Sequence, residues 1–151
     1  MKLKTKSLKL SPMKIGICEW ELPVTGLEAR FEWAARAGLA ALEIDLENAE
    51  ANEARIRTLS NHWNIHVPTL GINACCKHSM CRPADAAIIR TAFEAAVKTA
   101  TALGIEKLQV PSFCESHIHT EEDFLHTVEH YRFLCRLARG TGLIIGTENA
   151  L

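Results

Sequence analysis

The fold of this chain is decided by the stretch Gly142-Leu143-Ile144-Ile145-Gly146-Thr147-Glu148-Asn149-Ala150-Leu151. A short apolar run bounded by glycine is typical of a buried parallel strand. Parallel α/β folds place their chemistry at the carboxyl ends of the strands, and Glu148 stands at such an end. Taken alone, Glu148 is more simply the first polar residue after a strand. Only the elements upstream give it a function.

The composition limits the chain to one domain with small-molecule partners. The chain has 151 residues, of which 48% are hydrophobic, and a formal net charge of −1. That length allows one domain-sized core and leaves no room for two. Because the charges balance, no global field favours nucleic acid or an anionic membrane. No apolar run approaches the roughly 18 residues that a membrane span requires.

The cysteines indicate a reducing compartment. There are six of them, and no secretory signal accompanies them: Cys18, Cys75, Cys76, Cys81, Cys114 and Cys135. A chain of this size can build its core without disulfides. We therefore expect a cytoplasmic protein whose six thiols all react without prior reduction.

The first 12 residues differ in composition from the rest. They carry four lysines and no acid, and they lack the apolar block of a secretory signal. We expect a disordered basic extension over residues 1–12 and one domain over residues 13–151. A basic interaction tail is the functional alternative for the extension.

Strand and helix patterns alternate along the domain. Five segments are predicted strands: 15–18, 41–45, 66–72, 107–110 and the opening stretch. Amphipathic helices are predicted from a capping box at Thr25 to Gly38, through 56–63, from Pro83 to Gly104, and from Thr120 to Gly140. Pro68 makes the third strand irregular. Such alternation implies right-handed βαβ crossovers and a parallel sheet.

Two architectures fit this alternation. A five-stranded doubly wound sheet suits the length, because a complete (β/α)8 barrel needs about 200 residues at least. However, the loop from Glu19 to Thr25 has no glycine-rich cradle for phosphate, and no helix follows the last strand. A truncated (β/α)8 TIM barrel, with the first five strands and four helices, accounts for both facts. The doubly wound sheet is the alternative.

Four segments, in order, resemble successive strands of the xylose-isomerase-like TIM barrels: Lys14–Trp20, Ala37–Ile44, Ala102–Val110 and Thr147–Asn149. Within that superfamily the sequence is most similar to the sugar phosphate isomerase/epimerase group, which includes L-ribulose-5-phosphate 3-epimerases and hexulose-phosphate isomerases. The resemblance runs from about Met13 to Leu151. It covers five of the eight strands and implies the N-terminal part of such a barrel.

The resemblance implies a divalent metal, often manganese, bound by a glutamate, an aspartate, a histidine and a second glutamate from strands five to eight. Glu148 matches the first ligand and is implied to be both metal ligand and catalytic acid/base. A hard cation that binds a ketose carbonyl and its neighbouring hydroxyl acidifies the carbon-bound proton. The implied substrate is a sugar or sugar phosphate. This chain alone is expected to bind the metal weakly and to be inactive.

Other residues near predicted strand ends are candidates for a sugar pocket: Glu19, Trp20, Glu43 and Asn73. Polar groups there would bind hydroxyls, and the indole would pack on the ring. Core packing is the simpler explanation for Trp20, and a solvated loop position competes evenly for Glu43. Lys77 keeps a positive charge where relatives commonly show Ser-Ala-His-Arg-Arg. Cys75 replaces the histidine of that pattern, which weakens the case for a phosphate.

Three other interpretations stay open. Zinc is an alternative for the residues of two loops, although neither has paired CxxC spacing: Cys75, Cys76, His78 and Cys81, and Cys114, His117 and His119. A non-catalytic remnant or partner-binding module would use the unclosed sheet, whose edges favour self-association. A barrel that acts as a DNA-repair endonuclease would need several histidines at strand ends and a basic groove.

Overall fold

The computed structural model describes residues 13–148, in which the five predicted strands form one parallel sheet. The strands are β1 (Gly16–Cys18), β2 (Ala41–Asp45), β3 (Thr69–Gly71), β4 (Lys107–Pro111) and β5 (Ile144–Glu148). The extension predicted over residues 1–12 and the last three residues of the opening stretch lie outside the described part of the chain.

The strand order decides between the two architectures. In a doubly wound sheet the first strand lies in the interior, because the chain winds outward from it in both directions. Here the order is β1-β2-β3-β4-β5, with β1 and β5 at the edges. Every crossover therefore moves to the next strand in the same direction, as in a TIM barrel. The doubly wound alternative is wrong, and the sheet is a partial (β/α)8 barrel.

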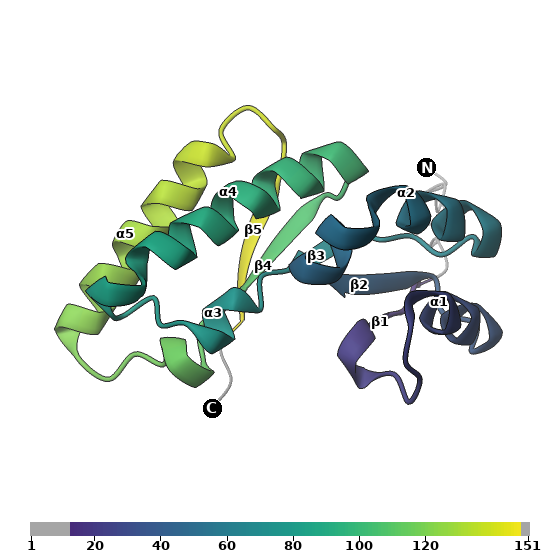
Figure 1. Ribbon diagram of the computed structural model, residues 1–151, viewed down its shortest axis with the longest axis horizontal. Helices are drawn as coiled ribbons and strands as arrows, with labels where there is room; N and C mark the ends of the chain where they lie inside the picture. The colour runs from purple at the N-terminus through teal and green to yellow at the C-terminus, as the bar shows by residue number, and fades with distance from the viewer. Residues whose placement is uncertain (1–12, 149–151) are drawn as a thin grey trace, which may run out of the picture.

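Four long helices cover one face of this sheet. They are α1 (Leu27–Arg36), α2 (Leu46–Trp63), α4 (Ala86–Leu103) and α5 (Glu121–Leu137). Because α1 packs on α2, α2 on α4, and α4 on α5, the helices form a single layer, which follows an arc outside the strands (Figure 1). Within residues 13–148, none of the helices is long and apolar enough to span a membrane.

The core lies between the helices and the outer face of the sheet. Strand side chains at alternate positions are fully buried there, namely Leu42, Ile44, Leu70, Leu108 and Val110. Each such side chain contributes about 1.5–3 kcal/mol when it is removed from water. Since side chains alternate between faces along a strand, the residues between these apolar ones point to the opposite, inner face. The core thus fixes which side chains face the inside of the barrel.

Helix ends follow the sequence signals only in part. The capping box predicted at Thr120 is confirmed, because its Oγ1 accepts from the Asp123 N–H at 3.1 Å and the Asp123 carboxylate accepts from the Thr120 N–H at 2.9 Å. The capping box predicted at Thr25 is wrong. Gly26, with φ of 86°, is the N-cap of α1, and no side chain caps the helix. Glycine adopts this backbone conformation without steric cost.

Prolines account for two further differences. Pro68 has no N–H to donate to a sheet. The third strand accordingly shortens to β3, while the Pro68 carbonyl accepts from the Lys107 N–H at 3.0 Å. Pro83 was predicted as the first residue of a long helix, but it opens the 3₁₀ turn η2 (Pro83–Asp85), and α4 begins at Ala86.

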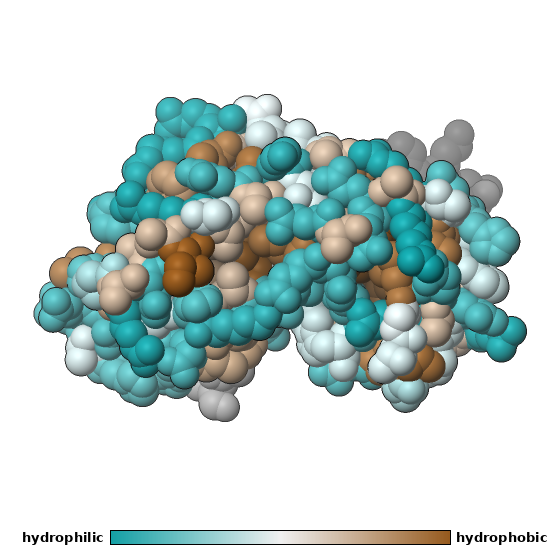
Figure 2. All heavy atoms as spheres, in the orientation of Figure 1, coloured by the Kyte–Doolittle hydropathy of each residue, from teal (hydrophilic) through white to brown (hydrophobic). Residues whose placement is uncertain are grey.

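Three short helices occupy loops at the carboxyl ends of strands. The 3₁₀ turn η1 (Glu19–Glu21) follows β1, the helix α3 (Ala74–Lys77) follows β3, and the 3₁₀ turn η3 (Cys114–Ser116) follows β4. The face seen in Figure 2 is mainly hydrophilic, with apolar surface in separate areas. Two isoleucines near the sheet edges are nevertheless well exposed, since Ile15 and Ile144 each keep 58% of their surface accessible.

Candidate functional site

Four polar side chains line the inner face of the sheet. We call Cys18 of β1, Glu43 of β2, Gln109 of β4 and Glu148 of β5 the inner polar cluster. Apolar residues at the alternate positions of the same strands face the helices and belong to the core or pack against it: Ile17, Leu42, Ile44, Leu108, Val110 and Ile145. Cys18 and Glu148 are the last residues of their strands, whereas Glu43 and Gln109 lie in the middle of theirs. The cluster therefore reaches the carboxyl ends of the strands, where barrels of this kind hold their chemistry.

The carboxylate of Glu148 is oriented by the neighbouring strand. Gln109 Nε2 donates a hydrogen bond to Glu148 Oε2. The backbone of Glu148 is held as well, because its carbonyl accepts from the Ser112 N–H at 2.8 Å. One residue back, the Thr147 hydroxyl accepts from Tyr131 of α5 at 2.8 Å. Hydrogen bonds on both faces of the sheet therefore hold the end of β5. The side chain of Glu148 points to the inner face and is exposed.

Glu43 lies where β3 leaves space for it. A Cβ atom on Gly71 would lie 3.6 Å from Glu43 Oε1 and 3.4 Å from Cη2 of Trp20, so the missing side chain opens room for both groups. Burial raises the pKa of Glu43, and the negative charge of Glu148 raises it further. Burial, followed by Glu43 and Glu148, raises the pKa of the Cys18 thiol to about 11. The negative charges of Glu43 and Glu148 thus both raise the pKa of Cys18.

Two oxygens of the cluster are buried without a hydrogen-bond partner among the described residues. They are Glu43 Oε1 and Gln109 Oε1. A buried polar atom in this state costs about 1–3 kcal/mol, so native structures usually supply a partner from protein, water or ligand. Acceptor oxygens of this kind fit the hydroxyl groups of a polyol.

The predicted sugar-site residues divide into two sets. Glu43, Trp20 and Glu148 come together, with the indole of Trp20 lying beside Gly71 and 44% of the residue exposed. Asn73 stands at the rim, where it is the N-cap of α3 and its N–H donates to Asp45 Oδ1 at 3.3 Å. The other two predicted residues, Glu19 and Lys77, have partners elsewhere.

Glu19 joins three elements inside the protein. It is buried; its Oε1 accepts from the Asp45 N–H and from Asn48 Nδ2, both at 2.8 Å, while its Oε2 pairs with Arg30. These contacts tie the turn after β1 to α1 and to the start of α2. Both carboxylate oxygens of Glu19 therefore serve the scaffold.

Lys77 pairs with Glu47 on the surface. Its ammonium group donates to Glu47 Oε1, and both side chains are exposed. The hydrogen bond with Glu47 raises the pKa of Lys77. The lysine is thus charged, but it is engaged with α2.

We expect the substitution Glu19→Ala to destabilise the chain strongly. It leaves the Arg30 guanidinium without its partner and removes the acceptor for the Asp45 N–H. Breaking a buried ion pair by removing one partner costs about 3–5 kcal/mol. Urea unfolding followed by circular dichroism measures the loss. Glu50→Ala, at an exposed position of α2, is the control and should change stability by only about 0.5 kcal/mol. Equal small losses in both variants would contradict the role given to Glu19.

The donor atoms of the cluster suit a hard divalent cation in kind, since they are carboxylate and amide oxygens. They are too few: within residues 13–148, no three His, Cys, Asp or Glu side chains lie close enough to hold a metal ion. The two candidate zinc sets do not assemble there either, although the rings of His117 and His119 stack at 4.6 Å. The described residues do not make a complete metal site.

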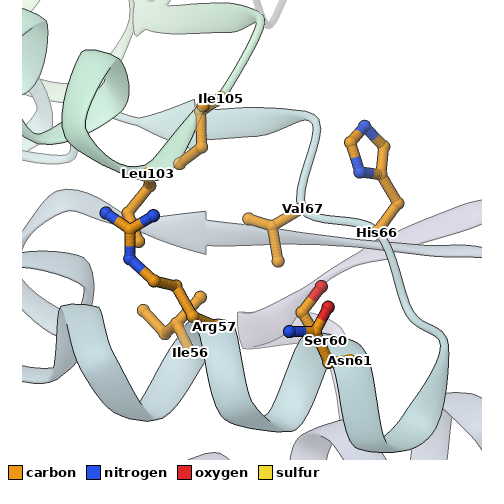
Figure 3. Close-up of a pocket in the computed structure, with 9 residues that line it drawn as sticks. Ile56, Arg57, Ser60, Asn61, His66, Val67, Leu103 and Ile105 are labelled. Atoms are coloured by element: carbon orange, nitrogen blue, oxygen red, sulfur yellow. The ribbon is translucent and has the colours of Figure 1, made fainter.

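A cavity of about 260 Å³ lies at the other end of the sheet, between the end of α2 and the segments that precede β3 and β4 (Figure 3). Three of its polar side chains have partners within the chain. Ser60 Oγ donates to the Ile65 carbonyl at 2.6 Å, Arg57 donates to the Ala102 carbonyl, and His66 lies 3.4 Å from Glu106. This cavity is a space in the packing, remote from the inner polar cluster.

Sequence reasoning missed Cys18 and Gln109 as members of the site. The signal was present in β4, where Gln109 is a polar residue between the apolar Leu108 and Val110. In a strand covered by helices on one face, such a residue marks the inner face.

The chain is similar to known proteins in sequence and in structure, although no protein-family model matches it. By sequence, the chain is 25% identical over 146 residues to the 2-epi-5-epi-valiolone 7-phosphate 2-epimerase of Actinoplanes sp. (strain ATCC 31044 / CBS 674.73 / SE50/110). The match covers 91% of this chain and 53% of the relative, so the chain spans about half the length of the curated relative it matches.

Solved structures share the fold. A sugar phosphate isomerase/epimerase from Parabacteroides distasonis ATCC 8503 matches 93% of this chain and 52% of its own, with a TM-score of 0.70 and 14% identity. An AP endonuclease of family 2 from Brucella melitensis matches 89% of this chain and 55% of its own, with a TM-score of 0.73 and 14% identity. At such identities these matches establish the fold alone. The chain therefore has the fold of a partial xylose-isomerase-like TIM barrel, and by sequence and fold together it resembles the sugar phosphate isomerase/epimerase group.

Proposed function

We propose that this chain is part of a carbohydrate isomerase or epimerase, one that moves a proton next to the carbonyl of a sugar or sugar phosphate. The observation that carries the proposal is the pair of carboxylates on the inner face of the sheet, Glu43 in β2 and Glu148 at the carboxyl end of β5. The sequence similarity to a sugar phosphate epimerase supports the same class. The endonuclease fold match has no comparable sequence match beside it.

Each residue of the site has a role in this proposal. Glu148, which Gln109 orients, takes or returns the carbon-bound proton and is a cation ligand. Glu43 and Gln109 offer their unpartnered oxygens to substrate hydroxyls. Trp20 packs its exposed ring face on the sugar.

Three further residues act around this centre. Asn73 stands at the rim, and Lys77 would meet a phosphate once its pair with Glu47 opens. Glu19 acts indirectly, since its bonds to Arg30 and to the Asp45 N–H hold the turn that carries Trp20.

A divalent cation, with manganese expected, belongs to the complete barrel in this proposal. When bound, it polarises the substrate carbonyl and so acidifies the neighbouring carbon-bound proton. This chain supplies Glu148 to it, and the other ligands would come from strands that follow in a full barrel. The chain alone is expected to bind the cation weakly.

The proposed protein is cytoplasmic, and a second candidate function concerns its assembly. All six cysteines are free thiols in the structure, which supports a cytoplasmic protein. The exposed isoleucines near β1 and β5 support a second candidate, a module that binds a partner or its own copies through the open sheet. Such a partner-binding module would not have to bind a sugar.

Ligand binding separates the two candidates. Ketohexoses and ketose phosphates, titrated to millimolar concentration, should change the tryptophan fluorescence of the chain, because Trp20 is exposed beside Glu43. The variant Trp20→Phe should lose the response. The control Trp63→Phe should keep it, since Trp63 packs against the core.

A second pair of variants tests the carboxylate. Glu43→Gln should weaken binding by about tenfold, the cost of a lost hydrogen bond to a charged group. Glu50→Gln, exposed on α2, should leave binding unchanged. If no sugar changes the fluorescence, or if Trp20→Phe responds like the parent chain, the carbohydrate proposal is wrong for this cluster.

A further inference from the structure

Another cavity, of about 240 Å³, lies between the start of α4 and the first half of α5. These two helices pack side by side on the outer face of the sheet (Figure 1). The wall of the cavity has four side chains with nitrogen donors and one acid, namely Arg82, Arg90, His126 and His130, and Glu129. Because the inner polar cluster lies on the opposite face of the sheet, this cavity is separate from the proposed sugar site.

Two arginines line the α4 side of the cavity. Arg82 precedes η2 and pairs with Glu115 at 2.8 Å, with both side chains well exposed. Arg90, in the second turn of α4, has its guanidinium carbon 5.2 Å from the centroid of the Phe133 ring on α5. The arginine ion pairs within residues 13–148 do not include Arg90. Its charge is therefore held beside α5 without a carboxylate in ion-pair contact.

Two histidines line the α5 side of the cavity. His126 and His130 are four positions apart, so they lie on the same face of the helix. His126 Nε2 is 3.7 Å from Oε1 of the exposed Glu122. The acid on the wall, Glu129, has a partner on its own helix, because its Oε1 accepts from Arg132 Nη1 at 2.6 Å. The net charge of the groups around the cavity is therefore positive.

His130 has a buried nitrogen that the chain leaves unsatisfied. The residue is 5% exposed, and its Nδ1 has no hydrogen-bond partner among the described residues. Buried polar atoms usually have a partner from protein, water or ligand. Burial lowers the pKa of His130, and the charges of Arg90 and His126 lower it further. A bound anion would accept a hydrogen bond from the ring and would oppose the repulsion from those two charges.

The start of α4 adds backbone donors. This helix has 18 residues, and within the described part of the chain no side chain caps its N-terminus or that of η2. Ala86, the first residue of α4, is on the cavity wall. The acid of the turn, Asp85, contacts the preceding loop, because its Oδ2 accepts from the Ser79 N–H at 2.9 Å. The positive end of the helix dipole therefore lies at the cavity, and this end favours an anion.

We propose that this cavity binds a phosphate group, with the Arg90 guanidinium and the imidazoles of His126 and His130 as its donors. A phosphate has several acceptor oxygens, which suit donors that approach from two helices at once. Arg82 adds a further donor at the edge of the cavity. Inorganic phosphate and the phosphate monoester of a small metabolite share this chemistry. The binding does not depend on the proposed sugar chemistry.

Equilibrium dialysis of the folded chain with radiolabelled inorganic phosphate tests the proposal. Sodium chloride keeps the ionic strength constant, so that the screening of surface charges does not change during the titration. We expect saturable binding of one phosphate per chain, which sulfate displaces and equimolar chloride does not.

Unlabelled glycerol 3-phosphate, used as a competitor, separates the two sources of the phosphate group. Displacement at a lower concentration than unlabelled phosphate requires would identify a monoester as the preferred ligand. Displacement only at a higher concentration would identify the free ion. Both results support the site, because both require one cavity that accepts either ligand.

Single variants locate the phosphate. Arg90→Gln should weaken binding by about tenfold or more, because a hydrogen bond from a charged donor is lost. The matched control Arg36→Gln, at an exposed position of α1, should bind like the parent. His130→Gln should also weaken binding, whereas His62→Gln, exposed at the end of α2, should not. Circular dichroism checks that each variant folds.

The side chain of Arg90 is exposed, so its replacement should leave the fold intact and the test does not depend on the buried His130. Three results would overturn the proposal. They are binding that does not saturate, phosphate that equimolar chloride displaces, and a folded Arg90→Gln variant that binds like the parent. In the last case the phosphate would bind elsewhere, for example at Lys77.

Discussion

The purified chain is expected to show no epimerisation of ketopentoses, ketohexoses or their phosphates, even with manganese added. Glu148 is the one residue that the resemblance identifies as a metal ligand. Within residues 13–148, no three potential ligands converge. A hard cation takes about six oxygen ligands, and waters alone would have to supply the rest. A cation held this loosely lowers the barrier to proton abstraction very little, because the substrate carbonyl is not fixed against it.

Exchange of substrate hydrogen for solvent deuterium is the most sensitive measurement of this activity, because it detects proton removal even without product release. The parent chain and Glu148→Ala should give the same background signal. Exchange that depends on added manganese in the parent and disappears in Glu148→Ala would show that the five strands suffice for catalysis. Manganese-dependent exchange that rises above background equally in both would point to a contaminating enzyme.

The second large effect concerns assembly. The polypeptide of residues 1–151 is expected to associate with itself at micromolar concentration. The sheet has edges at β1 and β5, each with unpaired backbone groups, and Ile15 and Ile144 lie near them with 58% of their surface exposed. Parallel sheets are normally covered on both faces. Each isoleucine gains on the order of 1.5–3 kcal/mol on full burial, and a dimer that covers both of them in both copies would bury four such side chains.

Light scattering across a dilution series measures this association. Ile144→Lys should shift the chain toward monomer, because a charge at the β5 edge opposes burial. Ile88→Lys is the matched control, since Ile88 is exposed on α4, away from the sheet edges. A parent chain that stays monomeric and unfolds cooperatively at micromolar concentration would mean that the open inner face is tolerated in water.

Much of the fold could be predicted from the sequence. All five strands and the four long helices appear, because apolar periodicity reports which face of each element is buried. Length alone favoured the doubly wound sheet, but the loop from Glu19 to Thr25, which lacks a glycine-rich cradle, and the resemblance favoured the truncated barrel. The spatial order of the strands confirms the truncated barrel.

The loops were harder to predict, because contacts distant in sequence hold them. The short helix α3 and the turn η3 are fixed to each other by the hydroxyl of Ser116, whose partners lie about 40 positions away in the chain. No local pattern reports such a bond. The Thr25 prediction failed for a local reason, because Gly26 has a positive φ and starts the helix one residue later.

For the candidate site, the sequence indicated which residues on strands are candidates. Glu43 and Glu148 were identified because they lie at or near the ends of predicted strands and because the resemblance implies roles for them. The positions of Glu19 and Lys77 depended instead on partners that the sequence does not reveal, namely Arg30 and Glu47. Strand periodicity gives the direction of a side chain, whereas its hydrogen-bond partners depend on how the elements pack.

The strand order also has a consequence for folding during synthesis on the ribosome. Every strand pairs with the one synthesised just before it, and every long helix packs on its predecessor. A ribosome can therefore release one strand–helix unit at a time, and each can dock on a surface that already exists. The bond from Gln109 to Glu148 needs only β4 and β5. The carboxylate of Glu148 is thus oriented as soon as β5 has paired with β4.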